Sequence, residues 1–210
     1  MAFPVPPPPP VSHHQFSLPQ RSVFDQLLEA CTKGSLDDVK RLTQQFGPSF
    51  PRLVCTYNAI LGTPLGIACE EGHLEVVRFL CLQANDVLLR EMLIGSYGQI
   101  SQPNSTLLAA YPYRGVTPLH RACYNGRFEV VQFLCSLPGI EEVFNIIEEE
   151  NKCTPLAAAS ITGNVEIVKF LLSWKNFSKE YIANAFNKTL EEDSSQDTIN
   201  ILLQAMQIYS

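Results

Sequence analysis

The sequence predicts an all-α solenoid in which short pairs of helices stack side by side. Four segments of the chain align with one another: ACTKGSLDDVKRL, ACEEGHLEVVRFL, ACYNGRFEVVQFL and ASITGNVEIVKFL, which begin at Ala30, Ala68, Ala122 and Ala159. Thr-Pro-Leu precedes three of them, and all four contain a glycine at the same place. Copies in the same phase indicate one structural unit repeated along the chain.

The first helix of each unit begins at a recognisable signature. Thr63-Pro64, Thr117-Pro118 and Thr154-Pro155 each precede an apolar stretch. A threonine oxygen can accept a hydrogen bond from an amide in the first turn, and proline suits the first helical position because its missing N–H group would have no partner there. These residues therefore predict three helix starts.

The glycines of the four segments are Gly34, Gly72, Gly126 and Gly163. A glycine at this place supplies the left-handed residue that ends a short helix. Apolar residues at helical spacing follow each glycine, for example Leu74, Val77 and Leu80. Each unit is thus expected to contain two short antiparallel helices.

The units are expected near 22–47, 60–84, 115–138 and 152–175, within a domain spanning 21–177. The first unit has no Thr-Pro-Leu but begins at Ser22 with Asp25 three residues later, which is a capping-box pattern. The second and third glycines are 54 residues apart, against 38 and 37 for the other pairs. An insertion is therefore expected within 82–114, with a short helix near Asp86–Ile94.

Both ends of the chain differ from the repeats. Residues 1–20 are rich in proline and are expected to form a disordered tail. Residues 178–210 contain two helical stretches without the repeat signature. They are expected to be either a helical cap on the last unit or a degenerate fifth repeat.

The segment TPLHRA at 117–122, with its downstream glycine and EVV-x-FL, resembles the ankyrin repeat, whose period is about 33 residues. The resemblance implies helix-turn-helix units with β-hairpin-like tips and an extended concave surface that binds other molecules. It also implies a structural role for His120, whose side chain ties the turns together.

Composition argues against several classes of function. The net charge is −6 and no stretch is strongly basic, so a nucleic-acid-binding surface is not expected. No segment is apolar enough to predict a membrane span. Seven cysteines, an odd number, do not suit a fully paired disulfide framework, and Cys31, Cys69 and Cys123 occupy the same repeat position. We therefore expect buried, reduced thiols and a cytoplasmic protein.

No pattern of catalytic residues is found. His120 and Cys123 lie three residues apart, but no third group that could orient them is suggested. The glycines do not have the spacing of a phosphate-binding loop, and no pair of cysteines has metal-ligand spacing. The chain is expected to have no catalytic site, no metal and no cofactor. A site in the insertion or C-terminal region is the less favoured alternative.

The resemblance implies recognition of a partner protein by an adaptor, inhibitor or recruiter. On the family pattern, the residue after Thr-Pro-Leu-x and the two before the glycine are expected to be exposed. Tyrosine and arginine often dominate the binding energy of interfaces. The candidate binding residues are Glu70, Glu71, Tyr111, Tyr113, Arg114, Arg121, Tyr124 and Asn125.

Some alternatives stay open at this stage. Tyr111 and Tyr113 could contact a partner or could pack the insertion onto the stack. Phe3-Pro4-Val5-Pro6-Pro7 resembles ligands of polyproline-binding domains, although similar runs occur in inert tails. A bacterial effector acting in the host cytoplasm is an alternative to a resident cytoplasmic protein, and a monomer is expected.

Overall fold

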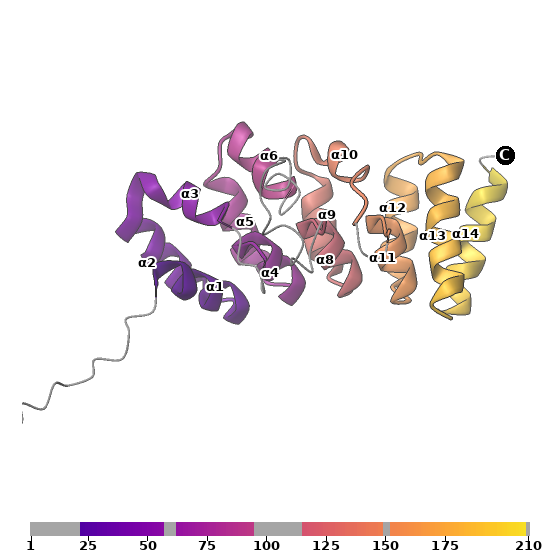
Figure 1. Cartoon of the computed structure of the whole chain (residues 1–210), viewed down its shortest axis with the longest axis horizontal. Helices are drawn as coiled ribbons and strands as arrows, with labels where there is room; N and C mark the ends of the chain where they lie inside the picture. The colour runs from indigo at the N-terminus through magenta and orange to yellow at the C-terminus, as the bar shows by residue number, and fades with distance from the viewer. Residues whose placement is uncertain (1–21, 57–61, 95–114, 149–151, 209–210) are drawn as a thin grey trace, which may run out of the picture.

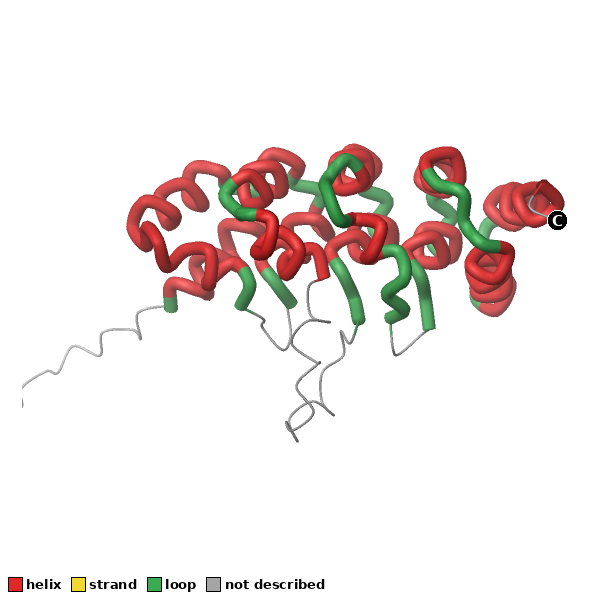
Figure 2. Tube along the Cα trace, turned by 90° about the horizontal axis from the view of Figure 1, so that it is seen from above, coloured by secondary structure: helices red, strands yellow, loops and turns green. Residues whose placement is uncertain are grey.

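The computed structural model describes residues 22–56, 62–94, 115–148 and 152–208. Two rows of antiparallel helices stack along the long axis of the molecule (Figures 1 and 2). The inner row contains α1 (Val23–Lys33), α4 (Pro64–Glu71), α8 (Pro118–Tyr124), α11 (Pro155–Ile161) and α13 (Lys179–Glu191). The outer row contains α2 (Leu36–Phe46), α5 (Leu74–Leu82), α9 (Phe128–Cys135), α12 (Val165–Trp174) and α14 (Gln196–Ile208).

Within each row, every helix packs against the equivalent helix of the next unit. The core between the rows is apolar and continuous, and it includes the fully buried Leu65, Leu119 and Leu156 of the three Thr-Pro-Leu signatures. Ala68, Ala122 and Ala159 are also fully buried, and their small side chains let the inner helices approach closely. The described residues contain no β-strand, and the predicted all-α solenoid is confirmed.

The three signature threonines cap their helices. The Thr63 Oγ1 accepts a hydrogen bond from the Gly66 N–H at 3.1 Å, and Thr154 Oγ1 accepts one from Ala157 at 3.2 Å. The proline after each threonine takes the first helical position. Local chemistry thus starts each inner helix at the residue that the sequence indicates.

The turn between the inner and outer helices is the same in four units. The glycine that ends each inner helix has a positive φ, between 69° and 83°. The amide of the next residue donates to the carbonyl five positions back at 2.9 Å, as in a Schellman motif. These donor and acceptor pairs are Ser35 and Ala30, His73 and Ala68, Arg127 and Ala122, and Asn164 and Ala159.

The last helix pair continues both rows: α13 packs on α11, and α14 packs on α12. The turn after α13 also repeats the Schellman bond, since the Ser194 N–H donates to the Thr189 carbonyl at 3.2 Å. Asp193 takes the place of the glycine, with φ of 49°. In these contacts and in this turn, α13 and α14 have the same arrangement as the helix pairs before them.

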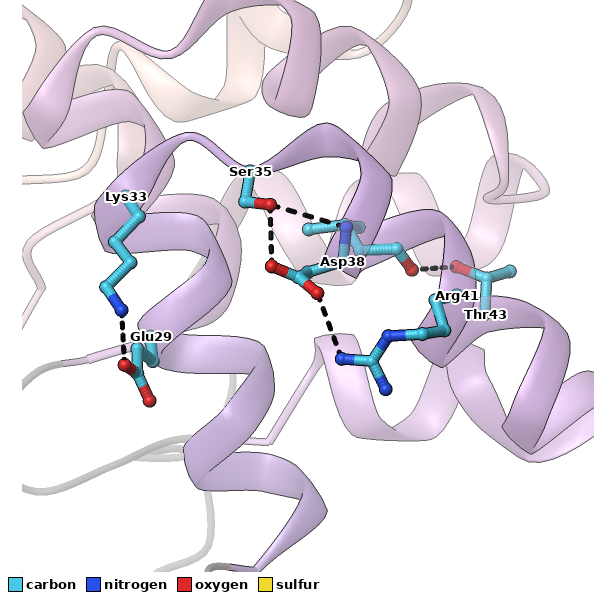
Figure 3. Close-up of polar contacts among 7 residues, drawn as sticks. Glu29, Lys33, Ser35, Asp38, Arg41 and Thr43 are labelled. Carbon is cyan, nitrogen blue, oxygen red and sulfur yellow. Dashed lines mark hydrogen bonds and ion pairs between the residues drawn. The ribbon is translucent and has the colours of Figure 1, made fainter.

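The first unit carries a polar network on its outer helix (Figure 3). The Ser35 hydroxyl donates to Asp38 Oδ2 at 2.7 Å, and Arg41 Nη2 donates to Asp38 Oδ1 at 3.0 Å. The hydrogen bond from Ser35, followed by that from Arg41, lowers the pKa of Asp38 below its usual value. Together with the hydrogen bond from the Asp38 N–H to Ser35 Oγ, this network holds the first turn of α2.

A third, incomplete row of short helices lies along the upper edge of Figure 1. It contains the 3₁₀-helix η1 (Gly47–Ser49), α3 (Phe50–Val54), α6 (Asp86–Ile94) and α10 (Ile140–Val143). α6 is the short helix that the sequence predicts near Asp86–Ile94, whereas α3 and α10 are not predicted. These helices follow the ends of the outer helices α2, α5 and α9.

Candidate partner-binding surface

The candidate surface is formed by the C-terminal ends of the inner helices α4 and α8, which pack against each other. It contains Glu70 and Glu71 from α4, and Tyr124 and Asn125 from the end of α8. Each of these residues lies just before the turn that leads to an outer helix. We refer to these four residues as the inner-helix surface.

Arg121 joins the two helices beneath this surface. Its Nη1 donates to Glu70 Oε2 across the interface between the second and third units. Its side chain is only 7% exposed, whereas that of Glu70 is 39% exposed. In this charge-assisted contact the Arg121 side chain is buried, whereas the Glu70 side chain is partly exposed to water.

The space for Arg121 exists because Gly66 has no side chain. A Cβ built on Gly66 would lie 3.3 Å from Arg121 Cδ, and one on Gly62 would lie 2.4 Å from Nη2. Gly66 occupies the position that His120 has in the next unit. The arginine of one unit thus fills the space left by the missing side chain of the unit before it.

The expectation that Arg121, Ile67 and Ala158 are exposed is wrong, because all three are buried. They share one position, in the middle of a short inner helix that has an inner helix on each side. Neighbours on both sides cover that position. In α4 and α8 the last turn, with Glu71 and Tyr124, is where residues reach the surface.

Tyr124 is the large apolar residue that this surface exposes, with 56% of its area accessible. Its backbone lies at the end of α8, where Asn164 Nδ2 donates to the Cys123 carbonyl at 3.0 Å and, at the longer distance of 3.4 Å, to the Tyr124 carbonyl. Asn125 is also exposed, and its Nδ2 donates to the Arg121 carbonyl at 2.9 Å. An aromatic ring held on a fixed backbone loses little freedom when a partner covers it.

Three side chains that the sequence analysis did not assign to the surface hold its turns in place. His73 Nε2 donates to the Thr32 carbonyl at 2.9 Å, Arg127 Nε to the Glu70 carbonyl at 2.8 Å, and Asn164 Nδ2 to the Cys123 carbonyl at 3.0 Å. Each donor directly follows its own unit's glycine and reaches the end of the preceding inner helix. The three donors occupy the same position in their repeats, and this shared position is the sequence signal for their role. Their residue types differ, so the residues themselves do not indicate a common role.

His120 forms hydrogen bonds with both of its ring nitrogens. The Thr117 N–H donates to Nδ1 at 3.3 Å, and Nε2 lies 3.2 Å from the Cys153 carbonyl of the next unit. Since an amide N–H only donates and a carbonyl only accepts, the proton must be on Nε2. Burial lowers the pKa of His120 to about 4, so the imidazole is neutral at pH 7.

The cysteines are all free thiols, and all except the partly exposed Cys55 are buried. Burial raises the pKa of Cys31, Cys81 and Cys135 to about 12. It also raises the pKa of Cys69 and Cys123 well above the usual value. The thiolate is the reactive form of cysteine, so burial makes these groups poor nucleophiles. Cys123 packs in the core beside His120 and is not poised for catalysis.

Several sequence predictions lie outside the described residues: the candidates Tyr111, Tyr113 and Arg114, the loop of the insertion and the Pro-rich tail at 1–20. Most residues of the hairpin-like tips are also outside them, although the Glu148 N–H donates to the Cys153 carbonyl at 2.9 Å across one tip. Among the described residues, no cluster of three metal-ligating side chains occurs. No described helix is long and apolar enough to cross a membrane.

The fold and its repeated turns define a solenoid of stacked helix pairs. A family model described as ankyrin repeats (3 copies) matches residues 27–143 and 83–184. The chain therefore belongs to the ankyrin-repeat family, whose members typically act as non-catalytic modules for binding proteins. A search of curated proteins gave no match.

Proposed function

We propose that this protein binds a partner protein through the inner-helix surface, without catalysis, as an adaptor, inhibitor or recruiter. The observation that supports this most directly is the exposure of Tyr124 on a rigid helix end. A tyrosine in this setting offers a large contact area and a hydroxyl group at a low entropic cost.

The charges around Tyr124 support the same proposal. Glu71 is exposed beside the Glu70–Arg121 pair, and the Arg127 side chain reaches the end of α4, where its Nε donates to the Glu70 carbonyl. A surface of this kind combines a central aromatic residue with a polar rim, which is the usual anatomy of a protein interface. Arg121 acts here as a positioning residue for Glu70 rather than as a residue that contacts the partner directly.

Photocrosslinking from two positions tests this proposal. A photoreactive phenylalanine analogue replaces Tyr124 in one variant and Gln132, an exposed residue of the outer helix α9, in the other. A partner captured from Tyr124 and not from Gln132 should bind about 30-fold more weakly to the Tyr124→Ala variant, which corresponds to about 2 kcal/mol. A partner captured equally well from both positions, or bound normally by Tyr124→Ala, would contradict the proposal.

A further inference from the structure

Apolar side chains are exposed on α6 and on the segments next to α6 and α10. Leu82, at the end of α5, is 78% exposed, and Val87, in the first turn of α6, is 72% exposed. Ile147, which follows α10, is 46% exposed. Leu89, Met92 and Leu93 are buried, so α6 packs through one side and presents Val87 on another.

The residues around these apolar side chains are mostly acidic. Asp86 and Glu91 are exposed on α6, and Glu141 and Glu142 are exposed on α10. Arg90 is the positively charged residue of α6 and α10. Its Nε and Nη2 donate to Glu142 Oε2 at 2.9 Å and 2.5 Å. Four carboxylates and one guanidinium leave a net charge of −3 on α6 and α10.

The contact between α6 and α10 fixes the relative position of these groups. The two helices pack against each other, and the Arg90–Glu142 ion pair links their exposed sides. Val87 lies one turn before Arg90 and Glu91 on α6, and side chains three or four residues apart on a helix are neighbours. Val87 is therefore an exposed apolar side chain next to Glu91, and Arg90 holds Glu142 on the neighbouring helix. We call this set of residues (Leu82, Val87, Asp86, Glu91, Glu141 and Glu142) the α6–α10 surface.

We propose that the α6–α10 surface binds a basic amphipathic segment of a partner protein. Leu82 and Val87 contact the apolar residues of that segment, and the carboxylates attract its lysine and arginine side chains. A second copy of this chain fits poorly, because the whole chain has a net charge of −6 and would bring the same acidic surface. Like charges placed opposite each other across an interface oppose binding.

This surface is separate from the inner-helix surface. Glu71 and Tyr124 end the inner helices α4 and α8 and so lie before the outer helices α5 and α9. In contrast, α6 and α10 come after these two outer helices. The two surfaces thus lie at opposite ends of the outer helices, about 12 Å apart along the helix axis. The protein could hold one partner at each end.

Fluorescence anisotropy with the full chain tests this inference. The probe is a labelled peptide of leucine and lysine residues at helical spacing, roughly five turns long. The Leu82→Ser/Val87→Ser variant and the Asp86→Lys/Glu141→Lys variant should each bind it about tenfold more weakly. The matched control is Glu129→Lys/Glu166→Lys, which makes the same charge change in the first turns of α9 and α12. Circular dichroism checks that each variant keeps its helices.

The inference holds if both surface variants lose affinity and the control stays within about twofold of the unmodified chain. It is overturned if the control weakens binding as much as Asp86→Lys/Glu141→Lys, since the attraction would then come from net charge alone. It is also overturned if the two serines have no effect. The full chain could also form a dimer that the Leu82→Ser/Val87→Ser variant does not form. In that case a second copy of the chain would occupy the α6–α10 surface, and the inference would equally be overturned.

Discussion

Arg121 passes directly over Gly66, so that a Cβ on Gly66 would lie 3.3 Å from both Arg121 Cδ and Nε. The glycine belongs to α4 and the arginine to α8, and Arg121 also pairs with Glu70 of α4. The contact between the second and third units therefore depends on a glycine and an arginine together.

Arg121→Ala should lower the free energy of unfolding by about 2 kcal/mol, because a buried, charge-assisted hydrogen bond and its packing are lost. Urea denaturation of the variant measures this change. Lys169→Ala, at an exposed position of α12, is the control and should change stability by less than about 0.5 kcal/mol. Equal effects of the two substitutions would show that Arg121 is not part of the stabilising contact between units.

Gly66→Ala should depend on Arg121. Alanine favours a helix over glycine by about 1 kcal/mol, but in the unmodified chain the new methyl group would lie 3.1 Å from Thr63 Oγ1 and 3.3 Å from Arg121 Cδ and Nε, and this crowding offsets the gain. Arg121→Ala removes the contacts with the arginine and leaves that with Thr63, so part of the gain should return and a double-mutant cycle should give a coupling of up to about 1 kcal/mol. Additive effects would mean that the two residues do not share one space.

His120 should make stability depend on pH. Its pKa is about 4 in the folded protein and near 6.5 when unfolded, so the unfolded chain takes up a proton first as the pH falls. The contribution of neutral His120 is fully present above pH 6.5 and is lost progressively towards pH 4, by a total of about 3 kcal/mol. Denaturation between pH 7 and pH 4 measures the slope. His120→Gln should be less stable at pH 7 but should have a flatter profile, and an unchanged slope would contradict this assignment.

Asp193→Gly should stabilise the protein by about 0.5 kcal/mol, because Asp193 has a positive φ that glycine adopts without strain. Asp193→Asn removes the same charge and keeps a side chain, so it is the matched control. Thermal unfolding compares the two variants. If Asn and Gly give the same change, the effect comes from charge, and the turn after α13 does not need the conformation found in the other units.

The thiols should react in an order set by burial. Burial raises the pKa of the buried cysteines, and it also raises that of Cys55, to about 11. Access of the reagent should therefore set the order: the partly exposed Cys55 should react first, and the buried cysteines only in denaturant. Mass spectrometry of the labelled protein identifies the sites. Elemental analysis of the purified protein is expected to find no bound zinc, and a stoichiometric amount would contradict this expectation.

The helices with local signals could be predicted from the sequence. Thr117-Pro118 and Gly126 mark the start and end of α8 through capping chemistry that acts over a few residues, and α6 follows from its apolar spacing. The short helices α3 and α10 are too brief to produce a periodic pattern. The burial of Arg121 escaped prediction because it depends on the inner helices α4 and α11 on either side of α8, which are distant in sequence. It also depends on Gly66, whose missing side chain leaves room for the arginine.

The cross-repeat bonds made by His73, Arg127 and Asn164 have a consequence for how such a chain can change length. Each of these residues completes the end of the preceding inner helix rather than its own. A segment that runs from the start of one inner helix to the start of the next therefore contains the side chain that donates to the preceding unit. It also contains the backbone carbonyl that accepts from the following unit. Because a backbone carbonyl accepts a hydrogen bond from imidazole, guanidinium or amide alike, a whole unit can be duplicated or lost among the four units that these bonds connect, and the junctions between the remaining ones keep a bond of this kind.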